Sequence, residues 1–262
     1  MQMLDILDRT FGIEFEFADV EKDKVVLPDG FSWNKEEVVI NTDASNGSFS
    51  SKNGGEVNTP PLKLNHKNIE DLKCTFNNLI NSGGRITWTK SVHVHIYVGD
   101  FDLDMLKRVF ALTYYTSRYM KMYCDVGEWN EEKWQCPSPT LEYFDNAMSA
   151  TNLELFYNVF ANSMNKGYIR HLVNVPSFFR RKTIEFRLFN PTYDFSEVFA
   201  GIMFAYRFIN YCVNHDIEEY SSISSLEDFV SKLKLNLPMA KKTPPLIFSG
   251  YQKHPHECFV SK

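Results

Sequence analysis

The chain has few cysteines, no long hydrophobic run and no excess of positive charge, and each absence excludes a class of protein. Its five cysteines are odd in number and form no C-x-x-C pair, which argues against a disulfide framework or a cysteine zinc site and favours a reducing compartment. The most apolar segment is short and contains Arg207, and the first ten residues include two acids. We therefore expect neither a membrane span nor a signal peptide, and predict a cytoplasmic protein.

The charge balance and the length set further limits. With a formal net charge of −5, the protein as a whole does not attract phosphate backbones, so a nucleic-acid partner is not expected. With 44% hydrophobic residues in 262, the chain can bury a substantial core, and it shows neither an internal repeat nor a low-complexity tract. We predict one catalytic domain over residues 1–236 and an irregular tail, rich in proline and lysine, over residues 237–262.

The segment FGIEFEF, residues 11–17, is the first informative one. Its apolar residues alternate with Gly12, Glu14 and Glu16, which predicts a strand with one apolar face. The two carboxylates then lie on the other face, roughly 6–7 Å apart. Like charges at that distance repel unless water or a cation relieves them, so the strand raises the question of a cation.

Alternation and helical spacing elsewhere predict a mixed chain. The segments read as strands are 24–28, 36–45, 54–58, 85–89, 91–99, 167–175 and 181–190. The segments read as helices are 66–82, stopped by Gly83-Gly84, and 102–125, 152–165, 196–213 and 225–235. Strands in hairpin-like order interrupted by single helices predict an α+β fold, with a largely antiparallel sheet and helices on one face.

The polar faces of these strands share one chemistry. A period of two places carboxylates, imidazoles and a guanidinium together, in place of the threonines and lysines of a solvated sheet. These residues are Glu14, Glu16, Glu56, His93, His95, Glu185 and Arg187. Carboxylates, often together with substrate phosphates, bind Mg²⁺ or Mn²⁺, and an arginine fork suits a phosphate oxygen. The set predicts a metal–nucleotide site.

Four segments in this order resemble the amidoligase (carboxylate–amine ligase) family, a distant branch of the glutamine synthetase and γ-glutamylcysteine synthetase fold. They are GIEFEF, TDAS…GGEVNTPPL, HVHI and TIEFRLFN…T, spanning about Phe11 to Thr192. The resemblance implies a curved, mostly antiparallel sheet like that of the glutamine synthetase catalytic domain, with helices on its convex face. It also implies a concave face that binds ATP and two or three Mg²⁺ or Mn²⁺ ions.

The resemblance implies an activity as well. ATP phosphorylates a carboxylate, and an amine then attacks the acyl phosphate. The substrates expected are small molecules, amino acids or peptides, and a modified nucleobase stays among those considered. Specificity is expected in the loops 46–54 and 126–140, where Trp129 and Trp134 suggest a lid.

Site roles are implied residue by residue. The metal ligands are Glu14, Glu16, Asp43, Glu56, Glu185 and one of His93 and His95, of which His93 is favoured. Glu185 and Arg187 are the catalytic pair, and Arg187 stabilises the transferred phosphoryl group. The nucleotide or substrate contacts implied are Arg170, Asn174, Arg85 and Thr192.

Other interpretations stay open. The same general sheet serves guanidino phosphotransferases, and His93 and His95 could belong to a metal-dependent hydrolase that needs no ATP. A degenerate ligase fold that only binds a nucleotide or ligand is the non-enzymatic alternative. The basic run Arg180-Arg181-Lys182 is either a turn before a strand or a contact to an anionic substrate.

Overall fold

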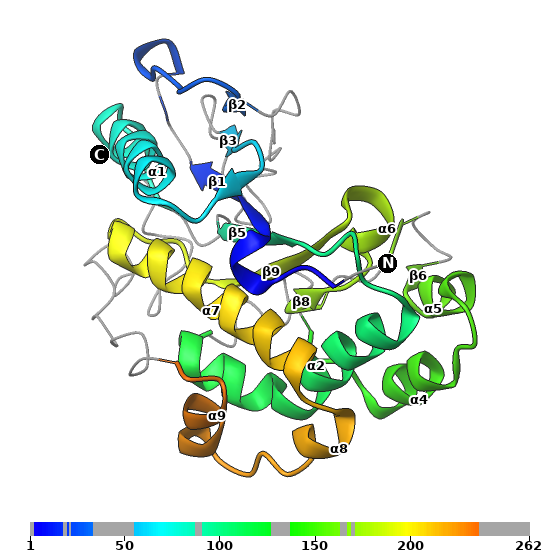
Figure 1. Ribbon diagram of the computed structural model, residues 1–262. Helices are drawn as coiled ribbons and strands as arrows, with labels where there is room; N and C mark the ends of the chain where they lie inside the picture. The colour runs from blue at the N-terminus through cyan, green and yellow to red at the C-terminus, as the bar shows by residue number, and fades with distance from the viewer. Residues whose placement is uncertain are drawn as a thin grey trace, which may run out of the picture.

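An open antiparallel sheet forms the centre of the molecule (Figure 1). The computed structural model describes residues 3–17, 20, 22–33, 55–86, 91–126, 137–162, 167–168 and 171–235. From one edge to the other the strands are β2 (Ser32–Trp33), β3 (Gly55–Asn58), β1 (Thr10–Phe17), β5 (Val92–Tyr97), β9 (Thr183–Phe189) and β8 (Val173–Asn174). A further strand, β4 (Leu62–Lys63), pairs with the start of β1. The predicted α+β class is confirmed.

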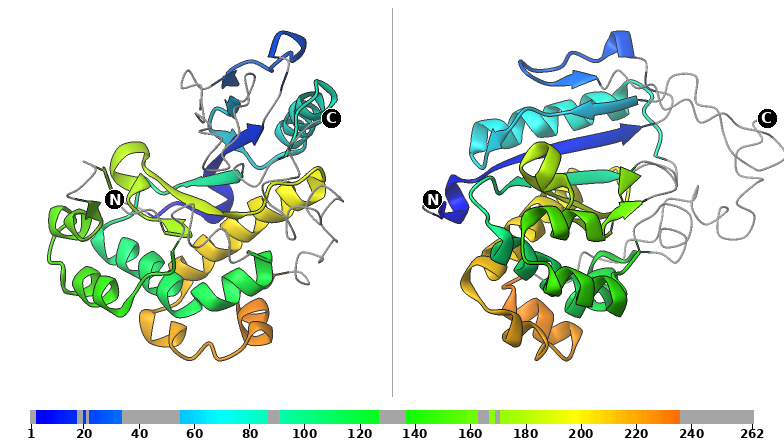
Figure 2. Two further views of the ribbon diagram at one scale, coloured as in Figure 1. Left: turned by 180° about the vertical axis from the view of Figure 1, so that it is seen from behind. Right: turned by 90° about the vertical axis from the view of Figure 1, so that its right-hand side faces the viewer.

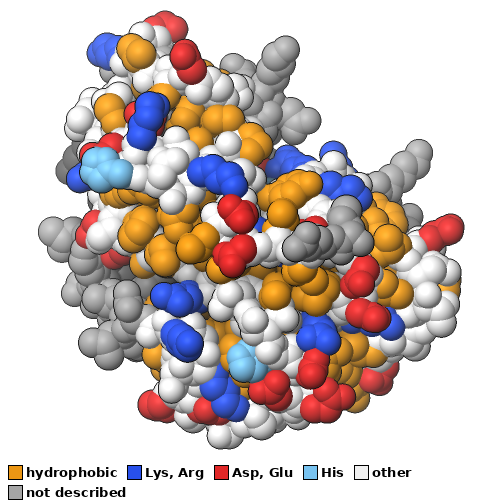
Figure 3. Space-filling model, in the orientation of Figure 1, with side chains coloured by type: hydrophobic (Ala, Val, Ile, Leu, Met, Phe, Trp, Pro, Cys, Tyr) orange, Lys and Arg blue, Asp and Glu red, His pale blue; other side chains and the backbone are white. Residues whose placement is uncertain are grey.

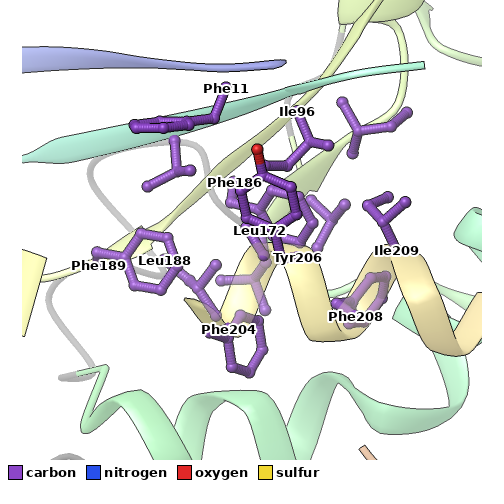
Figure 4. Packing of buried hydrophobic residues seen from close by; sticks show 14 of the residues in the cluster. Phe11, Ile96, Leu172, Phe186, Leu188, Phe189, Phe204, Tyr206, Phe208 and Ile209 are labelled. Atoms are coloured by element: carbon purple, nitrogen blue, oxygen red, sulfur yellow. The ribbon is translucent and has the colours of Figure 1, made fainter. Parts of the chain in front are cut away.

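The apolar face of the sheet is covered by α1 (His66–Asn81) and α7 (Phe195–Asn214). Phe15 meets Phe76 of α1 with ring centroids 5.5 Å apart, and Phe186 meets Phe208 of α7 at 5.5 Å. Figure 4 shows the side chains of the strands and of α7 interleaved between the sheet and the helix. Because this face is buried, each strand must keep its polar residues on the opposite one. The convex curvature expected for the helical side stays a prediction.

A second layer of helices packs on α7. Its main member is α2 (Leu103–Cys124), which begins at the cap Asp102 and ends at Asp125 in the left-handed conformation, with φ of 51°. Tyr123 of α2 stacks on Phe204 of α7. The shorter helices α4 (Leu141–Ser149), α5 (Leu153–Val159), α8 (Ile217–Tyr220) and α9 (Leu226–Lys232) complete this layer (Figure 2). None of the described helices is both long and apolar enough to cross a membrane.

The predicted strand at 24–28 is wrong. The short 3-10 helix η2 (Lys22–Lys24) is followed by an irregular segment in which Val25 is buried and Val26 is exposed. The alternation is therefore real, but Pro28 has no N–H to donate, and a turn follows in which the Phe31 amide donates to the Pro28 carbonyl. The predicted strand at 36–45 lies outside the described residues.

Three further predictions need correction. The helix predicted over 152–165 is α5, which ends at Val159, and the chain then forms the hairpin of β6 (Ala161–Asn162) and β7 (Gly167–Tyr168). The single strand predicted over 167–175 is therefore split between β7 and β8, which belong to different sheets. Of the strand predicted over 85–89, the described Arg85 makes an isolated bridge. The helices α4, α8 and α6 (Ser177–Arg181) were not predicted.

A buried ion pair ties the start of β1 to the turn between β5 and α2. Both Nη atoms of Arg9 donate to the Asp100 carboxylate, at 2.6 and 2.9 Å, and the Leu4 amide donates to it at 2.8 Å. The Arg9 side chain is fully buried. Burial alone would raise the pKa of Asp100, but its contacts with Arg9 outweigh that and hold the pKa below its ordinary value. The pair therefore fixes one end of the strand that carries Glu14.

We predict that Asp100→Asn lowers the free energy of unfolding by about 3–5 kcal/mol at pH 7, because it leaves the Arg9 charge buried without its counter-ion. Urea unfolding followed by circular dichroism measures the change. Since the Asp100 pKa is lowered in the folded state, the stabilisation is present above the ordinary aspartate pKa and is lost as the pH falls through the lowered value. The difference from wild type should therefore shrink in acid. The control is Asp71→Asn in the exposed pair with Lys67, expected to change stability by no more than about 0.5 kcal/mol.

Candidate functional site

Strand registers bring the polar residues of five strands together. On the face away from α1 and α7, Glu14 of β1 lies opposite His93 of β5, and His95 of β5 lies opposite Glu185 of β9. The same face pairs Glu16 of β1 with Glu56 of β3, and Glu185 with Asn174 of β8. Residues far apart in the chain therefore form one cluster, because each is a direct cross-strand neighbour of the next.

Glu14 lies at the centre of this cluster and is 8% exposed. Its Oε2 atom is 3.0 Å from His93 Nδ1, and its Oε1 atom is 3.2 Å from His95 Nε2. Arg181 Nη1 donates to the same Oε1 atom. Burial would raise the pKa of Glu14, but the hydrogen bonds and charges of the two histidines outweigh it and hold the pKa far below its usual range. Glu14 is therefore an ionised carboxylate.

Glu185 is the second buried carboxylate of the cluster. Arg187 Nη1 donates to its Oε1 atom and Asn174 Nδ2 to its Oε2 atom, so both oxygens are oriented. Burial favours the protonated form, but the charge of Arg187 and those of the two histidines lower the pKa of Glu185 to about 2. The pairing of Glu185 with Arg187, adjacent on one face as the sequence predicts, thus gives a fixed anion beside a fixed cation.

The two histidines have different partners. His93 uses both ring nitrogens, Nδ1 on Glu14 and Nε2 on the Ser91 hydroxyl at 2.6 Å. Burial and Arg187 oppose its protonation, but Glu14 and the neighbouring carboxylates outweigh them and raise its pKa. His95 places Nδ1 3.1 Å from the Thr183 hydroxyl, and its Nε2 faces Glu14.

One group of described residues has the arrangement of a metal site. Ligand atoms of Glu14, His95 and Glu185 all lie within 4.8 Å of one another, and all three residues are buried. Two carboxylates and an imidazole fit Mn²⁺, and the carboxylates alone fit Mg²⁺. The geometry thus favours His95 over His93 as the ligand, since the hydrogen bonds of His95 Nδ1 orient its Nε2 toward the carboxylates. Metal binding itself stays a prediction.

A second pair of carboxylates adjoins this group. Glu16 accepts hydrogen bonds from the Ser91 amide at 3.0 Å and from the Ser91 hydroxyl at 3.1 Å, and Glu56 lies directly opposite it. The charge of Glu56 also acts on Arg181. The face therefore holds four carboxylates, Glu14, Glu16, Glu56 and Glu185, against the two guanidinium groups of Arg181 and Arg187. Protonated His93 and His95 would balance the remaining charge, but a histidine that binds a metal is neutral, and with both imidazoles neutral the face has an excess of two negative charges. A divalent cation would neutralise that excess.

Ser91, His93 and Glu14 form a row that resembles a nucleophile, base and orienting acid. Within the described residues, the Ser91 amide, a donor that could stabilise an oxyanion, donates instead to the Glu16 carboxylate. The arrangement therefore favours a role of Ser91 in orienting Glu16 and His93.

The remaining predicted residues have varied positions. Arg85 is exposed shortly after α1, and the Thr192 hydroxyl accepts from the Asp194 amide at the start of α7. Asp43, Arg170 and the loop with Trp129 and Trp134 lie outside the described residues. The structure adds Arg181, Ser91 and Thr183 to the cluster. Of these, Arg181 had a signal in the sequence, a basic run for which an anionic contact was one interpretation, and Thr183 shares by alternation the face of Glu185 and Arg187.

An antiparallel sheet that gathers buried carboxylates, histidines and an arginine on one face defines an α+β protein with a candidate metal site. A family model described as "Putative amidoligase enzyme" matches residues 29–209, more than half of the chain. The chain therefore belongs to the amidoligase family, as the motifs predict. No curated protein matches it. The matched segment begins after β1, so the family match does not include Glu14 and Glu16. These two residues belong to the site because β1 pairs with β3 and β5.

We predict that Mn²⁺ binds the protein with His95 as its imidazole ligand. Pulsed electron paramagnetic resonance of the Mn²⁺ complex detects a directly coordinated nitrogen. The nitrogen coupling should vanish in His95→Gln and persist in His93→Gln, although the second change should also weaken binding by about tenfold or more, since His93 orients Glu14. Loss of the coupling in His93→Gln alone would restore the favoured assignment to His93, and its persistence in both variants would contradict His95 as the single imidazole ligand. Absence of the coupling in wild type would contradict any imidazole ligand.

Proposed function

We propose that the protein is an ATP-dependent carboxylate–amine ligase that works through an acyl phosphate and uses Mg²⁺ or Mn²⁺. The observation that carries the proposal is the pair of ionised, buried carboxylates, Glu14 and Glu185, facing His95 with Arg187 beside them. Membership of the amidoligase family supports the formation of an amide bond.

The reaction accounts for the residue types at the site. Amide formation from a carboxylate and an amine is unfavourable in water, so the carboxylate must first be activated. In the proposed reaction a carboxylate oxygen attacks the γ-phosphorus of ATP and ADP leaves. The amine then attacks the carbonyl carbon of the acyl phosphate, loses a proton and expels inorganic phosphate. Phosphoryl transfer depends on positioning and on neutralising charge across the phosphate oxygens, which explains the concentration of charged groups.

The chain's own residues supply the positioning. Asn174 and Arg187 fix the plane of the Glu185 carboxylate, and His93 and His95 fix that of Glu14. Glu14, Glu185 and His95 would hold the divalent cation, which supplies charge neutralisation for the nucleotide phosphates. The fork of Arg187, 14% exposed as a side chain, is placed to bind a phosphoryl oxygen next to that cation.

The test is a trap for the acyl phosphate. With ATP, Mg²⁺, hydroxylamine and pools of amino acids or small acids, we expect a hydroxamate to form together with ADP. Carboxylate labelled with ¹⁸O should pass one labelled oxygen to the released phosphate. Release of ADP with a single guanidino compound and no hydroxamate would indicate a phosphotransferase. Hydrolysis without ATP would indicate a hydrolase, and failure to bind any nucleotide would contradict the ligase and the phosphotransferase.

We predict that Glu185→Gln and Arg187→Ala each lower turnover by at least about 10³-fold, because each removes a charge placed at the transferred phosphoryl group. Hydroxamate formation measures the loss, and near-ultraviolet circular dichroism checks that the fold persists. The control is Arg180→Ala, which removes an exposed arginine of α6 near the start of β9. It should leave turnover within about twofold of wild type. Full activity in both site variants would show that the chemistry occurs elsewhere.

A further inference from the structure

A cavity of about 410 Å³ adjoins the cluster on one side. Glu14 and His95 are among its lining residues, and neither Glu16 nor Glu56 lines it. The walls come from β1, β3 and the turn after it, β5, α6 and β9, and include Gly12, Thr59, Arg181 and Thr183. The volume is that of a small-molecule pocket, and its position puts a bound molecule in contact with the proposed metal ligands.

Gly12 forms part of the cavity wall for a reason other than backbone conformation. Glycine in the middle of a strand is destabilising by roughly 0.5–1 kcal/mol relative to alanine, so it marks a need for flexibility or for space. Gly12 has no positive φ, and a Cβ atom there would meet Thr59 Oγ1 and His95 Cβ only at 3.6 and 3.9 Å, ordinary contact distances. A side chain at position 12 is therefore compatible with the fold, and its absence keeps the cavity open beside Glu14.

Arg181 is the one lysine or arginine among the described residues that line the cavity. It is the last residue of α6, and its side chain is 54% exposed although it reaches Glu14. Its hydrogen bonds within the described structure use Nη1 alone, to Glu14 and, at 3.5 Å, to His95 Nε2. The guanidinium group has five N–H donors, so a planar fork is left for a carboxylate. Figure 3 shows lysine and arginine side chains gathered over α6.

The position of Arg181 conflicts with a bound cation. Its Nη1 atom lies on the Oε1 atom of Glu14, beside His95 Nε2, which is where a metal held by Glu14, His95 and Glu185 would bind. Two positive groups at hydrogen-bond distance from one oxygen repel strongly in a buried site. Because the arginine side chain is long and half exposed, it can rotate off Glu14 without movement of α6, and the cavity that it already lines is the space beside it.

We propose that this cavity is the subsite for the small carboxylate substrate, with Arg181 as the residue that binds its anionic group. Arg181 neutralises Glu14 in the metal-free protein, leaves it when the cation binds, and then pairs with the carboxylate in the cavity. The inference rests on the function proposed above.

The first test uses Mn²⁺ alone, measured by titration calorimetry on the full chain. Arg181→Ala removes the competing cation, so Mn²⁺ should bind at least threefold more tightly than to wild type. Gly12→Val fills the cavity without replacing a proposed ligand. A Cβ atom at position 12 meets His95 only at its Cβ, at the ordinary contact distance of 3.9 Å, so Mn²⁺ affinity should stay within twofold, as it should in the control Arg180→Ala. Weaker or unchanged Mn²⁺ binding in Arg181→Ala would overturn the competition between Arg181 and the cation.

The second test uses ¹³C-labelled acetate, succinate and L-glutamate on the Mn²⁺-loaded protein. Paramagnetic relaxation of the labelled carboxylate should report binding of at least one acid to wild type and to Arg180→Ala. In Arg181→Ala and Gly12→Val the affinity should fall at least tenfold. Equal relaxation in all four proteins, or none in wild type, would overturn the subsite.

These results separate the subsite from the ligase activity. Hydroxamate formation by wild type with undiminished affinity of the acids for Gly12→Val and Arg181→Ala would overturn the subsite and leave the ligase standing. The expected binding pattern without any hydroxamate would overturn the ligase and leave a metal-dependent carboxylate site. A thermal unfolding measurement on Gly12→Val shows whether its fold persists, and Gly12→Ala, which adds one methyl group, should give a smaller loss in the same direction.

Discussion

The antiparallel register of β1, β5 and β9 is the constraint on which the site depends. It sets Glu14 against His93 and His95 against Glu185, so three strands contribute to one cluster. Since side chains alternate between faces, a slip of one residue would turn these charges into the layer of α7. The register holds because the same strands present large apolar side chains to the helices. A bulge in β9 shifts the register at one end, because Val94 pairs with Phe186 but Val92 pairs with Phe189. The side chain of Phe189 is therefore buried in the core.

The charges of the cluster are tolerated in a buried place because each is compensated by a neighbour. Glu14 faces two histidines and Arg181, and Glu185 faces Arg187 and an amide. Removing the partner of a buried charge is far more destabilising than breaking a surface pair. The compensation depends on the charges of the two histidines, because four carboxylates face only two guanidinium groups. Because of that imbalance, the cluster can be stable in the folded protein and still attract a cation.

The sequence predicted the elements that carry their own periodic signal. The strands β1, β5 and β9 and the helices α1, α2 and α7 each bury one continuous apolar face, which alternation or helical spacing reveals. Short elements such as β8 and α6 have too few residues to show a periodic face, and their form depends on partners distant in the chain. The same limit applies to the site. Glu14, His95 and Glu185 lie on periodic strands and were found, whereas Arg181 reaches Glu14 only because α6 ends where it does.

The position of residues along β1 divides the site into two ends. Toward the C-terminal end, Glu16 is paired with Glu56 and Ser91, a carboxylate-rich end that fits cations and the phosphates they bind. Toward the N-terminal end, Gly12 and Arg181 line a cavity, and this end fits a small anion. Glu14 lies between them and contacts both histidines. A reaction that joins a phosphate donor to a carboxylate needs such an order, since the two substrates must meet in line at one point. The alternation G-x-E-x-E therefore places one open position and two anions on a single rigid strand.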